Sequence, residues 1–197
     1  MIPLIPLALG VSLAMSPTTP APAFAQINWT SMGAPAPLFP TQEEWQPQMG
    51  DRIVVDTKAN EGFLIHADGR MLQFPVATGQ RRGVCYIGRC YNAATPQRTW
   101  QIQAKDIKGD HITFGPSGRF LRLFWNEEST PYGFHEYGYE ERMFDDQPRF
   151  KSMGCVIVKK DIMDILDRTF SVNEGNVKVV TKYGVEEPMR LALALQE

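Results

Sequence analysis

The feature that most constrains the fold is a series of short β-type segments, most of them followed by residues that favour turns. Runs rich in β-branched, aromatic or alternating apolar residues occur at 52–56, 63–66, 71–76, 100–105, 112–114, 120–125, 156–158 and 177–182. A clear helical period occurs at 161–170, where the residues on one face are Ile162, Ile165, Leu166 and Phe170. This pattern predicts a mainly β domain, a sandwich or barrel-like fold, with one clear helix.

The size and charge of the chain exclude some classes of function. The 197 residues, of which 43% are hydrophobic, suffice for one domain with a sizeable core. The formal net charge is −2, whereas a protein that binds nucleic acid requires clustered Lys and Arg. No apolar run reaches the ~18 residues of a membrane-spanning helix. We therefore expect one globular domain and no nucleic-acid partner.

The N-terminal residues have the pattern of an export signal. Residues 1–15 are apolar and uncharged, and Ala23, Phe24 and Ala25 form an A-x-A cleavage site. We therefore expect residues 1–25 to be a signal peptide that is cleaved after Ala25, and the mature protein to be periplasmic. Because no Lys or Arg precedes the apolar region, an apolar tail that is disordered or packed on the domain is the alternative.

A proline-rich arm at 26–50 follows, then a catalytic domain at 51–183 and a C-terminal tail at 184–197. Proline excludes a long helix or a central strand from the arm. Its large apolar side chains, which favour packing on the domain, are Trp29, Leu38, Phe39 and Trp45. One hypothesis is that residues 34–45 cover the active-site cleft. The alternative is that the arm is a mobile linker.

The three cysteines divide into a pair and a single residue. Cys85 and Cys90 are five positions apart, and a turn at Gly88 would bring them within the ~7 Å between Cα atoms that a disulfide requires. Cys155 would then remain free, as a reactive thiol must. The alternatives for the pair are two free thiols or half of a zinc site. No clustered zinc partners accompany the pair in the sequence, so we expect no metal.

Residues 132–160 hold the candidate chemistry. Cys155 follows a glycine and opens a β-branched run, which predicts a loop entering a strand, with the N–H groups of Gly154 and Cys155 directed to one point. A thiol nucleophile also requires a base, and His135 has a near-neutral ordinary pKa. The irregular residues 136–151 between them predict a loop or lid. The alternatives are a buried packing cysteine and an inert loop histidine. His66 and His111 lie in hairpin or turn contexts and are expected to be structural or on the surface.

This stretch resembles the signature of the L,D-transpeptidases of the YkuD family. That signature is a His, a spacer of similar length, Ser or Thr, His, Gly, Cys, any residue, and Asn or Arg. Here 16 residues separate His135 from Ser152, and Gly154 and Cys155 stand at their family positions. Met153 replaces the second His, and Ile157 replaces the Asn or Arg. The resemblance extends over residues 51–181.

The resemblance implies a cysteine acyltransferase on a β-sandwich, without cofactor or metal, that joins donor and acceptor stem peptides of peptidoglycan. In that family a thioester forms on the cysteine, here Cys155, and a backbone carbonyl, here that of Glu136, orients the base, here His135. The N–H groups of Gly154 and Cys155 are the expected oxyanion hole. The residues expected to contact the substrate are Tyr137, Arg149, Ser152 and Met153.

The departures at Met153 and Ile157 remove two polar side chains beside the nucleophile. They indicate a substrate selection unlike that of 3,3-crosslinking members. The subgroup that forms 1,3-crosslinks, from L-Ala to diaminopimelate, is the hypothesis that they favour. An insertion between Thr78-Gly79 and Thr95-Pro96, which contains the cysteine pair, is expected near the cleft. The alternatives are an L,D-carboxypeptidase or endopeptidase and an inactive cell-wall-binding module. The sequence leaves the oligomeric state open.

Overall fold

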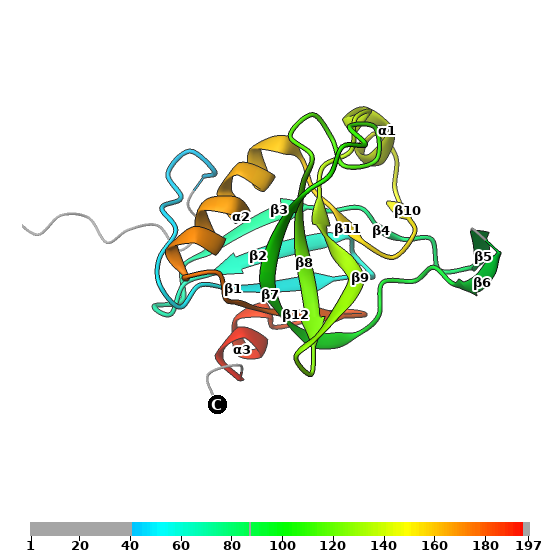
Figure 1. Ribbon diagram of the computed structural model, residues 1–197. Helices are drawn as coiled ribbons and strands as arrows, with labels where there is room; N and C mark the ends of the chain where they lie inside the picture. Colours follow the sequence, from blue (N-terminus) through cyan, green and yellow to red (C-terminus); the bar gives the residue numbers. More distant parts are fainter. Residues whose placement is uncertain (1–40, 87, 195–197) are drawn as a thin grey trace, which may run out of the picture. The chain divides into compact units, whose positions relative to one another are not determined.

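The computed structural model describes residues 41–86 and 88–194. An eight-stranded sheet in the order β11-β9-β8-β7-β12-β1-β2-β3 forms most of this region (Figure 1). Its strands are β1 Arg52–Asp56, β2 Glu61–Ile65, β3 Met71–Pro75, β7 Arg98–Ile107, β8 Arg119–Trp125, β9 Glu128–His135, β11 Val156–Ile157 and β12 Val177–Lys182. The domain is therefore mainly β, as the sequence predicts.

Two small sheets and three helices complete the described residues. The small sheets pair β4 (Thr78–Gly79) with β10 (Phe150–Ser152), and β5 (Gly83–Tyr86) with β6 (Arg89–Asn92). The helices are α1 Glu140–Phe144, α2 Lys160–Val172 and α3 Pro188–Leu193. The α2 helix is the predicted one, longer by one residue at its start and two at its end. No helix among the described residues is long and apolar enough to cross a membrane.

The two faces of the sheet bury alternate residues of β1 against different helices. Ile53 and Val55 belong to the main core, which also contains the buried face of α2. Val54 belongs to a second cluster, which contains Ala192 of α3. This alternation follows from the two-residue period of a strand. The apolar stripe of α2 explains its position over one face, and its fully or nearly buried members include Ile162, Ile165 and Leu166.

Several sequence predictions about elements are wrong. The predicted strand at 112–114 is a turn, and the loop predicted at 136–151 contains α1 and most of β10. Strand β9 was not predicted. The run at 120–125 is apolar at most positions, which predicts burial on both faces, yet Trp125 is 39% exposed. Strand β8 still pairs with β7 and β9, with a register shift in each pair, and it contributes buried side chains such as Leu121 and Leu123 to the core.

The segment before β1 is anchored by Trp45. Its side chain is buried in the core, and its ring stacks on His66 with ring centroids 3.8 Å apart. This confirms that the arm packs on the domain at Trp45, which does not line the cleft described below. The signal peptide and the other large residues of the arm, Trp29, Leu38 and Phe39, lie outside the described residues.

The disulfide predicted between Cys85 and Cys90 is present. The two cysteines are opposite each other in the β5–β6 hairpin, whose turn contains Gly88 with a φ of 73°. Only glycine adopts such a positive φ without strain, so the predicted turn position is confirmed. Cys155 is the free cysteine of the chain.

Candidate active site

Strand register brings His135 to the face of the sheet that carries the candidate nucleophile. His135, at the end of β9, pairs with Phe120 of β8 on one side and with Ile157 of β11 on the other. Paired residues on neighbouring strands project to the same face. Phe120, His135 and Ile157 therefore form one row across three strands.

A second row contains Cys155. Arg122 of β8 pairs with Gly133 of β9, and Cys155 comes two positions before Ile157 at the entrance to β11. Because side chains alternate along a strand, Cys155 projects to the same face as His135. Gly133 lies between Arg122 and Cys155 in this row. A Cβ at Gly133 would lie 2.5 Å from the ring of Phe120, so the missing side chain lets that ring pack against the backbone of β9.

The turn before Cys155 has a geometry that requires glycine. Gly154 has a φ of 121°, and a Cβ at this position would lie 2.7 Å from the ring of Tyr132. The hydroxyl of Ser152 donates to the carbonyl of Cys155 at 2.6 Å and accepts from the N–H of Gly154 at 3.1 Å. Ser152 therefore builds the turn. Of the two N–H groups predicted to hold an oxyanion, that of Gly154 already has a partner, which leaves the N–H of Cys155.

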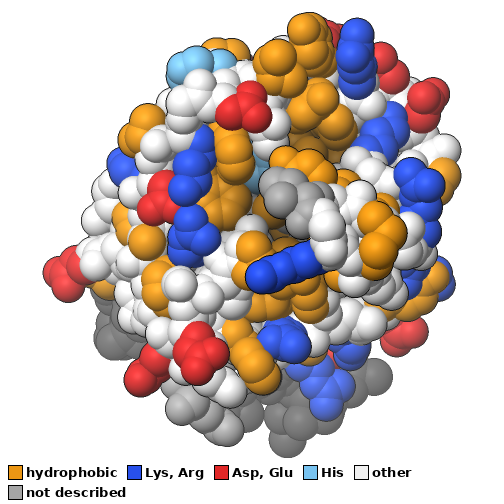
Figure 2. Space-filling view, turned by 45° about the vertical axis from the view of Figure 1, so that its right-hand side comes forward, with side chains coloured by type: hydrophobic (Ala, Val, Ile, Leu, Met, Phe, Trp, Pro, Cys, Tyr) orange, Lys and Arg blue, Asp and Glu red, His pale blue; other side chains and the backbone are white. Residues whose placement is uncertain are grey.

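Cys155 and His135 line the same cleft, which has a volume of about 450 Å³. Figure 2 shows an apolar hollow on this side of the molecule, with a histidine inside it and Lys or Arg side chains along one rim. The aromatic side chains of the lining are Phe114, Phe120 and Tyr137, and its basic ones are Lys108, Arg122 and Lys151. The cleft therefore combines apolar walls with positive charge.

His135 is held in one orientation. The residue is 4% exposed, and its Nδ1 lies 2.6 Å from the carbonyl oxygen of Glu136. Since a carbonyl only accepts, Nδ1 carries the hydrogen, and Nε2 is then the nitrogen that can take a proton. The ring of Phe114, with its centroid 5.1 Å from that of His135, packs against the imidazole. The structure thus places the Glu136 carbonyl where the family resemblance implies it.

Burial makes the resting pair electrically neutral. Burial lowers the pKa of His135, opposed by the carbonyls of Glu136 and Thr113 and by the Glu136 carboxylate. Burial also raises the pKa of the Cys155 thiol to about 11, against an ordinary value of 9.0. Near pH 7 the site therefore holds a thiol and a neutral imidazole. The thiol sulfur lies 3.7 Å from the carbonyl of Pro131, and no hydrogen bond joins Cys155 to His135 among the described residues.

A buried carboxylate supports the residue that orients His135. The side chain of Glu136 is 2% exposed, and its Oε1 accepts from the hydroxyl of Ser117 and from Arg119, each at 2.7 Å. Arg119 also donates to Asp164 of α2 at 2.5 Å. The other oxygen, Oε2, is buried without a hydrogen-bond partner. This network ties the backbone beside His135 to α2 and places negative charge near the imidazole.

Two basic side chains of the cleft share one carboxylate. Asp106 accepts from Lys108 at 2.9 Å and from Arg122, whose Nη1 also donates to the carbonyl of Thr130 at 2.7 Å. Lys151 donates to a backbone carbonyl at 2.7 Å. The lining contains three basic side chains and no Asp or Glu, and the nearby Asp106 and Asp146 offset part of this positive charge. Arg122 was not predicted, although it is the only charged residue of the apolar run 120–125.

Three of the four residues expected to contact substrate line the cleft, namely Tyr137, Ser152 and Met153. Met153 is 39% exposed and presents an apolar side chain beside Cys155. Arg149 does not line the cleft. It is 7% exposed, and its guanidinium donates to the backbone carbonyls of Val76 and Asn60 and to the carboxylate of Glu61. Arg149 therefore joins the start of β10 to the β1–β3 region.

The other two histidines lie away from this cleft. His66 is buried and its Nδ1 lies 2.5 Å from Asp51 Oδ1. His111 is exposed, with its Nδ1 3.3 Å from the carbonyl of Gly115. Both are structural or surface residues in the structure, as the sequence predicts.

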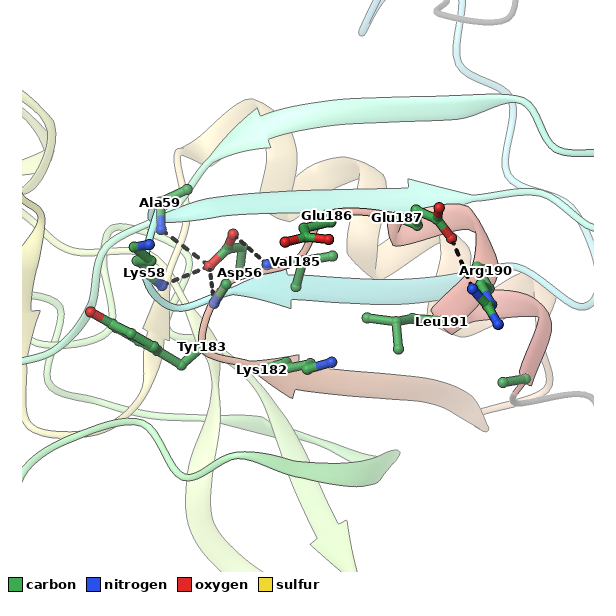
Figure 3. Close-up of a pocket in the computed structure, with 12 residues that line it drawn as sticks. Asp56, Lys58, Ala59, Lys182, Tyr183, Val185, Glu186, Glu187, Arg190 and Leu191 are labelled. Atoms are coloured by element: carbon green, nitrogen blue, oxygen red, sulfur yellow. Dashed lines mark hydrogen bonds and ion pairs between the residues drawn. The ribbon is translucent and has the colours of Figure 1, made fainter.

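A larger groove, of about 1010 Å³, lies between α3 and the ends of β1 and β12. Figure 3 shows Asp56 among the residues that line it, with its carboxylate accepting from the backbone N–H groups of Lys58, Ala59 and Val185. These hydrogen bonds join the turn after β1 to the turn after β12. No cysteine or histidine lines this groove, so the chemistry is assigned to the cleft that contains Cys155.

A cysteine on the same sheet face as a buried imidazole, with that imidazole fixed by a backbone carbonyl, defines a candidate site for cysteine-dependent acyl transfer. The chain belongs to the YkuD family, the L,D-transpeptidase catalytic domain, whose pattern matches residues 50–181. A search of curated protein sequences gives no match.

The solved structures that are similar to this chain include two L,D-transpeptidases and a cell shape determining protein. The L,D-transpeptidase (residues 123–326) of Xylanimonas cellulosilytica is 16% identical, with a TM-score of 0.50 over 70% of this chain and 63% of that one. The helical cell shape determining protein Pgp2 of Campylobacter jejuni, as a K307A mutant, is 15% identical, with a TM-score of 0.48 over 77% and 54% of the two chains. The catalytic domain of the Enterococcus faecium L,D-transpeptidase is 16% identical, with a TM-score of 0.45 over 67% and 96%. The chain thus spans less than two thirds of the first two structures.

Proposed function

We propose that this protein is a peptidoglycan L,D-transpeptidase that uses Cys155 as its nucleophile and His135 as its base. The observation that carries the proposal is the placement of both residues on one face of adjacent strands, above one cleft, with His135 Nδ1 fixed by a carbonyl. That arrangement leaves Nε2 as the acceptor of the thiol proton.

In the first half-reaction, Nε2 of His135 takes the proton of the Cys155 thiol while the sulfur bonds to a stem-peptide carbonyl carbon that follows an L-residue. The carbonyl π electrons move to oxygen, and the N–H of Cys155 donates to that oxyanion. The oxyanion then collapses and the C–N bond breaks. The departing amine takes the proton from Nε2, which leaves a thioester on Cys155.

In the second half-reaction, an amine of the acceptor stem gives a proton to Nε2 of His135 and bonds to the thioester carbon. The C–S bond breaks, and the sulfur of Cys155 recovers the proton from Nε2. A neutral imidazole can begin both halves, which agrees with the lowered pKa of His135. Water in place of the amine would give hydrolysis, the reaction of an L,D-carboxypeptidase or endopeptidase.

The charge of the cleft suits a substrate that carries carboxylates near the reacting bond. Lys108, Arg122 and Lys151 line the cleft without any Asp or Glu in the lining. Peptidoglycan stem peptides are anionic, and cations in a partly enclosed cleft attract such ligands. This supports stem peptides as both donor and acceptor.

The apolar side chains of Met153 and Ile157 support the formation of 1,3-crosslinks, from L-Ala to diaminopimelate. Both line the cleft, and Ile157 is 3% exposed. A donor whose acyl group is L-Ala has only a methyl side chain. This methyl group requires no polar partner from the side of the cleft that Met153 and Ile157 form. A donor with the charged diaminopimelate side chain would lack such a partner at Met153 and Ile157.

We also propose that the protein acts in the periplasm. The A-x-A site at residues 23–25 and the disulfide between Cys85 and Cys90 support this location, because disulfides persist in oxidising compartments. Fractionation of cells that express the full chain would test it. Recovery of the protein in the cytoplasmic fraction, with residues 1–25 intact, would contradict export.

Incubation of the purified protein with sacculi or disaccharide-tetrapeptides, followed by muropeptide mass analysis, tests the activity. The expected products are new crosslinked dimers, with 1,3-linkages located by fragmentation. The matched control is Cys155→Ala, which removes only the sulfur and is expected to give no product while its circular dichroism stays unchanged.

The products also separate the alternatives. Trimmed stems without dimers would indicate a carboxypeptidase or endopeptidase. Unchanged muropeptides would indicate an inactive wall-binding module. Dimers with 3,3-linkages alone would contradict the inference from Met153 and Ile157, and turnover by Cys155→Ala close to that of the wild type would end its assignment as nucleophile.

A further inference from the structure

The β5–β6 hairpin stands apart from the rest of the described residues. Its two strands pair only with each other, and Figure 1 shows them at the end of two connecting segments, away from the eight-stranded sheet. An isolated two-stranded hairpin is marginally stable in water. Here the disulfide between Cys85 and Cys90 links the strands directly. The hairpin is thus held by a covalent bond rather than by burial in the core.

One face of this hairpin is aromatic and basic. The register pairs Tyr86 with Arg89, and Val84 with Tyr91, whereas the disulfide lies on the opposite face. Tyr86 is 60% exposed and Tyr91 is 37% exposed. We call Val84, Tyr86, Arg89 and Tyr91 the Tyr86 face. Exposed tyrosines with a nearby guanidinium are typical of surfaces that bind a partner.

The stretch of sequence that contains the hairpin is basic. Residues 69–105 contain no Asp or Glu, although the whole chain has a formal net charge of −2. The basic residues of this stretch are Arg70, Arg81, Arg82, Arg89, Arg98 and Lys105. Arg82 and Arg89 make no ion pair with a carboxylate in the described part of the chain. An anionic partner would therefore find guanidinium groups whose charge no carboxylate offsets.

The base of the hairpin adjoins the nucleophile from outside the His135 cleft. A Cβ at Gly154 would lie 3.8 Å from the carbonyl of Ala93, the residue that follows β6. The pKa of Tyr132 is raised, mainly by burial. Negative charge on Cys155 or on Tyr91 would raise this pKa further, so Tyr132 lies near both residues. Tyr132 packs on the turn before Cys155 but does not line the cleft. A polymer held on the hairpin would therefore stay near Cys155 without filling the cleft.

We propose that the Tyr86 face is an anchoring site for polymeric peptidoglycan, separate from the reaction cleft. Sugar rings would pack on Tyr86 and Tyr91, and carboxylates along the polymer would bind Arg89 and Arg82. This inference rests on the proposed function, because it assumes that the cell-wall polymer is the substrate. Charge complementarity supports this partner. A membrane surface is disfavoured by the small number of aliphatic side chains on this face, where Val84 is the one aliphatic residue.

Co-sedimentation of the full chain with purified sacculi tests the anchoring site. We expect wild-type protein to pellet with sacculi, and high salt to weaken binding. The double variant Tyr86→Ser/Arg89→Ser should bind about tenfold more weakly, because it loses a charged hydrogen bond and an aromatic contact. Arg168→Ser, which removes the same charge from an exposed position on α2, should bind like wild type. Mass analysis confirms that Cys85 and Cys90 remain linked in each variant.

Two further measurements separate the possible results. Turnover of a soluble disaccharide-peptide should be equal in wild type and the double variant, because the reaction cleft is unchanged. Binding of wild type and double variant to sacculi with equal affinity would overturn the proposal. Tighter binding of wild type to phosphatidylglycerol vesicles than to sacculi would assign the face to a membrane instead. If wild type binds through the hairpin but forms no crosslinks, the proposed function fails while the anchoring site stands.

Discussion

Two buried histidines have similar surroundings but different expected roles. His66 and His135 are 1% and 4% exposed, and each fixes its Nδ1 at short distance, 2.5 Å from Asp51 and 2.6 Å from the Glu136 carbonyl. Only His66 has the carboxylate partner found in many catalytic triads. Yet Trp45 stacks on His66, whereas His135 lies in the cleft with Cys155. Access and a neighbouring nucleophile therefore identify the base better than an acidic partner does.

The largest effect expected from this comparison is that of His135→Ala. Removal of a positioned base should lower the crosslinking rate by a factor of about 10²–10⁴. Initial rates on a soluble disaccharide-peptide, measured with circular dichroism as a check of folding, give the result. A rate within about threefold of wild type in a folded variant would remove His135 from the mechanism.

The reactivity of Cys155 tests whether the His135 site rests as a neutral pair. With a thiol pKa of about 11 in place of 9.0, the thiolate fraction near pH 7 is about 100-fold lower than for an ordinary cysteine. Alkylation by iodoacetamide under non-reducing conditions labels this thiol alone, because Cys85 and Cys90 are linked. The rate should rise about tenfold per pH unit through pH 9. A plateau well below pH 9 would indicate a thiolate–imidazolium pair instead.

A smaller effect is expected from Glu136→Gln, which keeps the shape of the residue that orients His135 but removes its charge. The Glu136 carboxylate raises the pKa of His135, so its loss should lower that pKa further and move the acid limb of the pH–rate profile to lower pH. The rate at neutral pH should fall by about three- to tenfold, because a weaker base accepts the thiol proton less readily. Glu141→Gln on exposed α1 is the matched control. If the acid limb of the pH–rate profile did not move, Glu136 would act on His135 only through its backbone carbonyl.

The smallest effect on catalysis is expected from His66→Ala. Crosslinking should stay within about twofold of wild type at a temperature where the variant is folded. The free energy of unfolding should fall by about 3–5 kcal/mol, because Asp51 would remain buried without its partner. Urea unfolding followed by tryptophan fluorescence measures this change. A loss of rate comparable to that of His135→Ala would abolish the distinction between the two histidines.

Spacing and local pattern were sufficient for the parts of the site that lie close in sequence. The free Cys155 and the disulfide partner positions follow from short-range order, whereas the role of the carbonyl after His135 was implied by the family resemblance. Strand β9 escaped prediction because its buried residues are confined to its last three positions, so no alternation is visible. Helix α1 has no buried side chain and therefore no apolar stripe. In both elements the tertiary surroundings, rather than local preference, determine the structure.

The residues that support the site from a distance could not be predicted for a related reason. Arg119 and Asp164 are 45 positions apart, and they meet because α2 packs over the sheet. Arg149 shows the converse: its position in the motif region suggested substrate contact, but Asn60, 89 positions away, provides acceptors for it. Partner choice at such long separations depends on the completed fold.

The place of β12 in the sheet has a consequence for the order in which the chain can become structured during synthesis. β12 lies between β7 and β1, and its pairing with β1 is parallel. Until residues 177–182 have been made, the β1–β3 strands and the β7–β11 strands have no shared backbone pairing in the large sheet. The large sheet can therefore be completed only after β12 emerges, and before that the two halves are linked by the Ala77–Ile157 bridge and the small β4–β10 sheet.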